Sequence, residues 1–221
     1  MKLHIKLLLS IVAAMLLAGC ATSRSVVAVQ AAPSYQSANP ADGTAIKLVT
    51  TDLRKFELAP ATPDIPSLKN GEITNTAITS RAIARKRNGY GKALGDVLLP
   101  EGQTVATTVE SAVAAGFREA GYRVLRPGDP GFEDAVAVDA QINQYWSWVN
   151  IGFWALTLNC RSEVTLTAPL PGMETGLKVT ALADKSAQAA FESVWQDIAN
   201  QGLTELTRSV SRALPRRTAA F

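Results

Sequence analysis

The stretch Val136-Ala-Val-Asp-Ala-Gln-Ile-Asn-Gln-Tyr-Trp-Ser-Trp-Val149, followed by Phe153-Trp-Ala-Leu-Thr-Leu-Asn-Cys-Arg-Ser-Glu-Val-Thr-Leu-Thr167, decides the fold. Apolar and polar residues alternate in both segments, as is typical of strands in a sheet with one buried face. A three-residue turn at 150–152 places Trp148 opposite Trp154. The two segments therefore predict a long antiparallel hairpin at the centre of the fold.

Weaker patterns on both sides of this hairpin predict the remaining elements. We expect strands over 45–51, 73–79, 122–125 and 177–183, and helices over 103–120 and 186–212. The proline-rich segment 58–70 is expected to be a loop, because proline cannot complete a strand ladder. Each helix has one apolar stripe and the sheet has one apolar face. This combination predicts an α+β two-layer sandwich, with a mainly antiparallel sheet of four to six strands and two helices on one face.

The hairpin offers two candidate interaction surfaces. Polar side chains on one sheet face suit a glycan, a peptide or another domain, and include Asn143, Tyr145, Arg161, Asp139 and Glu163. Aromatic side chains near the turn suit a protein partner or a bilayer if they are exposed, and these are Trp146, Trp148, Phe153 and Trp154. The alternatives are a solvated sheet face and tryptophans packed in the core. Cys160 lies among aliphatic residues, so we expect it to be buried.

A basic segment precedes the first helix. Its cations are Arg81, Arg85, Lys86 and Arg87. It has neither the flanking elements nor the sequence of a phosphate-binding loop. We expect an exposed loop that is either solvated or in contact with anionic lipid head groups or an acidic partner.

The amino terminus has the layout of a secretory signal. A basic head and a short apolar run lead into Leu17-Ala-Gly-Cys20, where small residues precede the cysteine. These four residues resemble the bacterial lipobox, which implies cleavage before Cys20 and lipid on its sulfur. We therefore expect a signal peptide over 1–19, a lipidated Cys20 with a flexible tether over 20–44, one domain over 45–214 and a tail over 215–221. By resemblance to enterobacterial lipoprotein sorting, Ala21 in place of Asp favours the outer membrane, with the domain facing the periplasm.

Composition excludes several classes of function. The single histidine of the 221 residues, His4, lies in the signal, so histidine-based catalysis and histidine metal sites are excluded. The 22 basic residues outnumber the 19 acidic ones by three, and two of the basic residues lie in the signal. We therefore expect no nucleic-acid partner, no cofactor, no metal and no catalytic residue. A carboxylate hydrolase is disfavoured, because Asp139 and Glu163 are expected as cross-strand neighbours, too close for a water-mediated pair.

The lipobox, the segment Arg85-Lys-Arg-Asn-Gly-Tyr-Gly91 and the valine-spaced helix ending at Ala120-Gly-Tyr122 resemble the YajG-type family of bacterial lipoproteins. The resemblance spans most of 45–212 but not the segment 58–70. It implies an envelope lipoprotein without an established catalytic activity. We expect a non-enzymatic protein, held to the membrane by its lipid, that docks onto a partner protein or envelope assembly. The alternative is a small-ligand or glycan-binding auxiliary of a transport system.

Overall fold

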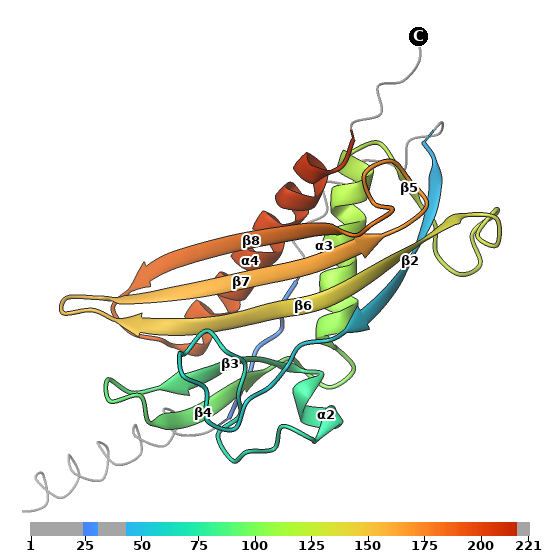
Figure 1. Cartoon of the computed structure of the whole chain (residues 1–221). Coiled ribbons are helices and arrows are strands. Elements are labelled where there is room, and N and C mark those ends of the chain that lie inside the picture. Colours follow the sequence, from blue (N-terminus) through green and yellow to red (C-terminus); the bar gives the residue numbers. More distant parts are fainter. Residues whose placement is uncertain (1–23, 31–42, 216–221) are drawn as a thin grey trace, which may run out of the picture.

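The computed structural model describes residues 24–30 and 43–215 (Figure 1). Cys20, the signal, residues 31–42 and most of the predicted tail lie outside the described residues. In chain order the elements are β1 (Ser25–Val26), β2 (Ala45–Asp52), α2 (Thr76–Thr79), β3 (Ala82–Arg87), β4 (Ala93–Leu98), α3 (Val105–Glu119), β5 (Arg123–Val124), β6 (Val136–Ile151), β7 (Leu156–Thr167), β8 (Leu177–Ala187) and α4 (Glu192–Ala213).

The predicted hairpin is β6 and β7, and β8 pairs antiparallel with the far edge of β7. Its predicted register is wrong. Trp148 lies opposite Asn159, not opposite Trp154, because pairing ends at Ile151 and Leu156 and leaves a longer turn. The α+β class is confirmed, since helices α3 and α4 together cover one side of the sheet (Figure 1).

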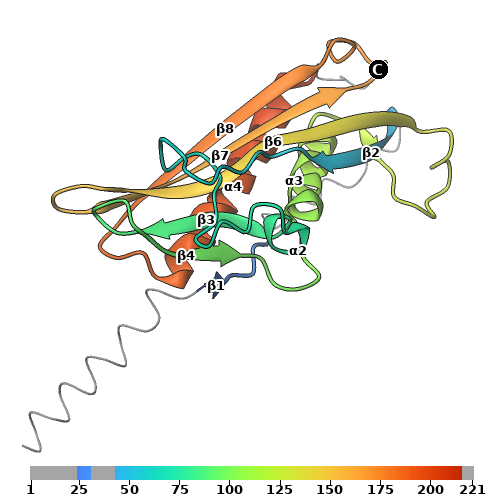
Figure 2. The ribbon, with the colours of Figure 1, turned by 60° about the horizontal axis from the view of Figure 1, so that its bottom comes forward.

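The sheet differs from the expected one in size and direction. Its described part has eight strands, and β2 and β3 both run parallel to β6. They follow each other along one edge of β6 and are joined by residues 53–81. Figure 2 shows β3 and β4 in this position, with β1 beside β4. We expected a mainly antiparallel sheet of four to six strands. Because β2 and β3 lie along one edge of β6 and run in the same direction as β6, the observed sheet is mixed.

Both predicted helices are present. Helix α3 begins after Thr104, whose side chain accepts a hydrogen bond from Thr107, and ends before Gly121, whose φ of 93° suits glycine. Helix α4 begins later than predicted because β8 continues to Ala187. Phe191, which lies within the range predicted for this helix, precedes its first turn and is 69% exposed.

A β-bulge at Asn143 changes which face the rest of β6 presents. Ile142 pairs with Val164 and Gln144 with Glu163, so Asn143 is the extra residue between them. Before the bulge, even-numbered residues face the helices, and after it odd-numbered residues do. Tyr145 is consequently buried under α4, where its hydroxyl donates to the Ala199 carbonyl oxygen at 3.0 Å. Its expected place on the polar face is therefore wrong.

The bulge also turns Trp146 and Trp148 to the side away from the helices. There they form a second core with Leu68, Ala82 and Leu98. The proline-rich loop packs over this cluster, and Trp146 Nε1 donates to the Pro63 carbonyl oxygen at 3.2 Å. The tryptophans are thus core residues, and the loop is their cover.

Buried Arg54 connects the loop to the sheet. Its guanidinium donates hydrogen bonds to three carbonyl oxygens, those of Thr79 at 2.8 Å, Ala82 at 2.6 Å and Tyr145 at 3.1 Å. It also pairs with Asp52 at 2.8 Å. These bonds satisfy backbone groups where β6 passes from β2 to β3.

Three further expectations are wrong. The strand expected over 73–79 is a loop followed by α2, capped by the Asn75 side chain. The basic segment forms strand β3, paired with β4, and is not an exposed loop. Within the expected flexible tether, Ser25–Val26 pairs with β4, and Val27 and Val29 are buried in the main core.

Candidate interaction surfaces

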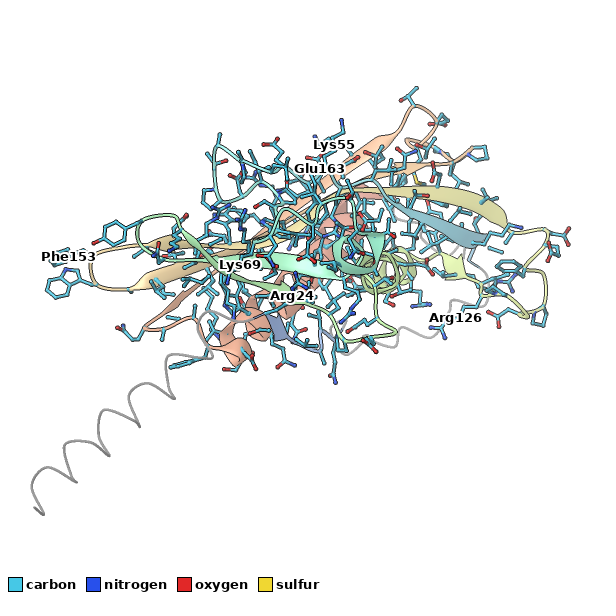
Figure 3. The ribbon with its side chains drawn as sticks, turned by 90° about the horizontal axis from the view of Figure 1, so that it is seen from below. Arg24, Lys55, Lys69, Arg126, Phe153 and Glu163 are labelled. Carbon is cyan, nitrogen blue, oxygen red and sulfur yellow. The ribbon has the colours of Figure 1, made fainter. Side chains whose placement is uncertain are left out.

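The turn between β6 and β7 carries the most exposed bulky side chains of the predicted surfaces. Phe153 is 90% exposed and Trp154 is 85% exposed. Their rings touch edge to face with centroids 4.7 Å apart, and Figure 3 shows Phe153 at one extremity of the molecule. The structure therefore separates the four aromatic residues into two buried and two exposed.

Two other chain segments lie beside this turn. In the turn between β3 and β4, Gly89 approaches the Ile151 side chain, and the neighbouring Tyr90 is 98% exposed. Phe191 shares with Ile151 a mostly apolar pocket of about 300 Å³. We call these three segments, 88–91, 150–157 and 186–191, the hairpin end. They contain no charged residue, although charged residues make up 19% of the chain.

The basic cluster is largely engaged within the fold. Arg81 donates to the Leu99 carbonyl oxygen, Lys86 to Ser25 Oγ, and Arg87 to the Gly91 carbonyl oxygen and Ser67 Oγ. Burial lowers the pKa of Arg85 from its ordinary value, and that of Arg87 is lowered by burial and by the charge of Arg85. Arg85, Lys86 and Arg87 lie on β3 and Arg81 directly precedes it, so these cations do not form an open basic loop.

The outer face of the sheet, turned away from α3 and α4, holds the remaining predicted polar residues. Asn143 donates to Thr165 Oγ1 at 2.9 Å. Arg161 pairs with Asp64 of the proline-rich loop at 3.2 Å and lies over the Trp148 ring. This part of the polar face is therefore partly covered by the chain itself.

Strand β8 forms an edge beside this outer face. Within the described residues it pairs with β7 alone. Leu182, on its outer side, is 55% exposed. Lys178 and Lys185, which could discourage another strand, are each paired with a carboxylate, Glu163 at 2.8 Å and Asp197 at 2.6 Å. Leu182 and Tyr90 were not among the predicted site residues, since single exposed residues give no periodic signal.

A groove of about 630 Å³ lies by α3, α4 and the segment after β5. Its lining includes Arg118 and Arg126, neither of which forms an ion pair with another described residue. Burial and the charge of Arg126 lower the pKa of Arg118. Glu110 and Glu119 also line the groove, so an anionic group would be received only beside Arg118 and Arg126. Sequence reasoning missed it because its residues come from distant segments.

Cys160 is fully buried in the main core, as predicted. Burial raises the pKa of the Cys160 thiol to about 12, so this predicted core residue stays protonated and inert. In the part of the chain that the structure describes, no three or more His, Cys, Asp or Glu residues are grouped for metal binding. Within residues 24–30 and 43–215, no helix combines the length and apolar composition needed to cross a membrane.

Comparisons with known proteins give only distant likenesses. No family model matches the chain, and no curated protein matches its sequence. A crystal structure of an uncharacterized protein, 8% identical, covers 86% of this chain and 97% of its own at a TM-score of 0.44. Lipoprotein GNA1162 from Neisseria meningitidis, 12% identical, covers 75% of this chain and 99% of its own at a TM-score of 0.24. A distant neighbour is thus a lipoprotein, and the YajG-type resemblance stays a prediction.

Proposed function

We propose that this chain is a non-enzymatic envelope lipoprotein that is anchored through Cys20 and receives a partner protein along the edge of β8. The anchor is supported by the Leu17–Cys20 motif and by the outer-membrane preference of Ala21. The domain would then face the periplasm.

Among the described residues no strand pairs with the outer edge of β8, and this observation carries the docking proposal. An edge strand presents unpaired backbone donors and acceptors, and an extended segment of a partner can pair with them. The exposed Leu182 side chain supplies an apolar contact beside that edge. Because Lys178 and Lys185 are neutralised by ion pairs, their charges oppose such pairing less.

Site-specific photo-crosslinking in intact cells tests this proposal. A photoreactive residue at Leu182 is expected to give a discrete crosslink to one protein, and the same residue at Gln201, exposed on α4, is the matched control. Equal products at both positions, or none at Leu182, would contradict docking along β8. Mass spectrometry of the mature amino terminus tests the anchor separately, with an acylated Cys20 as the expected result.

The second candidate function is ligand binding for a transport system, and the groove beside Arg118 and Arg126 favours it. Anionic glycans or small phosphorylated ligands would be suitable occupants, because two guanidinium groups there lack a carboxylate partner among the described residues. A thermal-shift screen checks this candidate. Stabilisation that disappears in Arg118→Gln supports it, and an unchanged melting temperature with every ligand counts against it.

A further inference from the structure

The hairpin end has the chemistry of a membrane-interface contact. Its exposed side chains are Tyr90, Phe153 and Trp154, and it carries no charge over three adjoining segments. Tyrosine and tryptophan prefer the boundary between lipid head groups and acyl chains, where an apolar ring and a polar atom are both accommodated. The opposite end of the molecule, where Figure 3 places Arg126, contains Asp129, Glu133 and Asp134 in one loop.

Strand direction shows which end of β1 faces the hairpin end. β1 runs parallel to β4, β4 antiparallel to β3, and β3 parallel to β6. β1 therefore runs opposite to β6, away from the hairpin end. The end of β1 that begins at Ser25 therefore faces the hairpin end, although β1 itself lies beside the last two residues of β4, Val97 and Leu98 (Figure 2).

The segment between Cys20 and Ser25 is short, and its length limits how far the lipid can be from the exposed aromatic side chains. Ser25 lies beside Val97, which is opposite Ala84, and Ala84 is paired with Ser147. From Ser147 to Phe153 a strand advances about 20 Å. The five residues from Ser25 back to Cys20 span at most about 18 Å. This span allows a lipid on Cys20 to approach the level of the hairpin end.

We propose that the hairpin end is a second membrane contact, with Phe153, Trp154 and Tyr90 seated in the interface of the bilayer that holds the Cys20 lipid. The inference rests on the lipid anchor of the proposed function. The occupant is phospholipid, because the anchor's reach and the aromatic, uncharged composition both favour it. The contact would orient the domain, with β8 at its side and the Arg126 loop away from the membrane.

A polarity-sensitive fluorophore tests this contact in the lipidated full chain, reconstituted into protein-free vesicles of phosphatidylethanolamine and phosphatidylglycerol. It is attached to Phe153→Cys, and Glu133→Cys at the opposite end is the matched control. Buried Cys160 remains unlabelled in the folded protein. We expect a blue shift and a rise in emission at position 153, and water-like emission at position 133.

Tryptophan quenching gives a second readout without a label. Phospholipids with brominated acyl chains are expected to lower the emission of the wild-type protein and to leave that of Trp154→Phe unchanged. The other three tryptophans, Trp146, Trp148 and Trp195, are each less than 9% exposed. Quenching that persists in Trp154→Phe would contradict the proposed contact.

The possible results distinguish failure of the proposed membrane contact from failure of the proposed lipid anchor. If Cys20 is acylated and position 153 stays water-like, the contact is wrong and the anchor stands. If Cys20 carries no lipid, the anchor of the proposed function is wrong and the contact falls with it. A shift at position 153 that occurs only in native envelope fragments, and not in protein-free vesicles, would assign the hairpin end to a protein and overturn the inference.

Discussion

The two halves of β6 bury their large side chains by different means. Before the bulge at Asn143, Val138, Ala140 and Ile142 face helices α3 and α4 in the main core. After it, Trp146 and Trp148 face the opposite side and are covered by an irregular proline-rich loop. The contrast shows that one extra residue can distribute a single strand between two cores. It also makes the loop's packing depend on a few contacts.

The largest loss of stability is expected for Trp146→Ala. Trp154→Ala, in the same hairpin, is the matched control. Removing the fully buried indole should lower the free energy of unfolding by about 4 kcal/mol, since it empties the second core. Removing the exposed Trp154 should change it by no more than about 0.5 kcal/mol. Urea unfolding of both variants measures the difference, and similar losses would contradict the division into buried and exposed tryptophans.

Arg54→Met tests how the loop is held over the second half of β6. The variant leaves the carbonyl oxygens of Thr79, Ala82 and Tyr145 without their donor, and we expect a loss of about 3 kcal/mol. Lys55→Met, at an exposed neighbouring position, is the control and should be nearly neutral. Limited proteolysis should cut the 53–75 loop faster in Arg54→Met. Equal cleavage of both variants would show that Arg54 does not hold the loop.

Gly202→Ala tests packing on the helix side of the sheet. A Cβ at this position would overlap Cys160 Sγ and lie 3.1 Å from Cys160 Cβ. We expect a loss of about 2 kcal/mol from overpacking. The double variant Gly202→Ala with Cys160→Ala should recover part of it, because the sulfur is removed. A thermal unfolding curve for the double variant that is no better than for the single one would argue against this contact.

At neutral pH the smallest effect concerns the Cys160 thiol, because its contribution changes only in alkaline solution. The folded pKa of Cys160 is about 12, above its ordinary value of 9.0, so the thiol stays neutral in the fold while it ionises in the unfolded chain. The stabilisation is therefore complete below pH 9.0 and is lost as pH rises towards 12. Unfolding free energy should fall by roughly 1 kcal/mol per pH unit in this window. Cys160→Ala should show a flatter profile, and identical slopes would contradict this origin.

The sequence pattern predicted the parts of the fold that repeat regularly. Alternation located β6, β7 and β8, and the valine spacing with Gly121 located α3. The pattern could not predict the hairpin register, or which residues after Asn143 face the helices. A bulge exchanges the faces of odd- and even-numbered residues without changing the local composition. The parallel placement of β2 and β3 depends on the route of the connecting loop, which contains no periodic signal.

Less of the candidate interaction surfaces than of the fold could be predicted from the sequence. Phe153 and Trp154 are exposed, as the interaction-surface alternative required, whereas Trp146 and Trp148 are buried, as the core alternative required. The basic residues of β3 were visible as a cluster, but their internal partners Ser25, Ser67 and Leu99 come from distant segments. The edge of β8 became apparent only with the strand order, since pairing partners are a property of the whole sheet.

The incorporation of residues 24–30 into the fold constrains the order in which the domain can be completed. This segment is synthesised before every other described strand, yet Arg24 binds Asp96, 72 positions later. β1 cannot dock until β4 has emerged, and Val27 and Val29 stay solvent-exposed until then. If Cys20 is processed as proposed, cleavage and lipidation can therefore precede the docking of β1 and the completion of the domain.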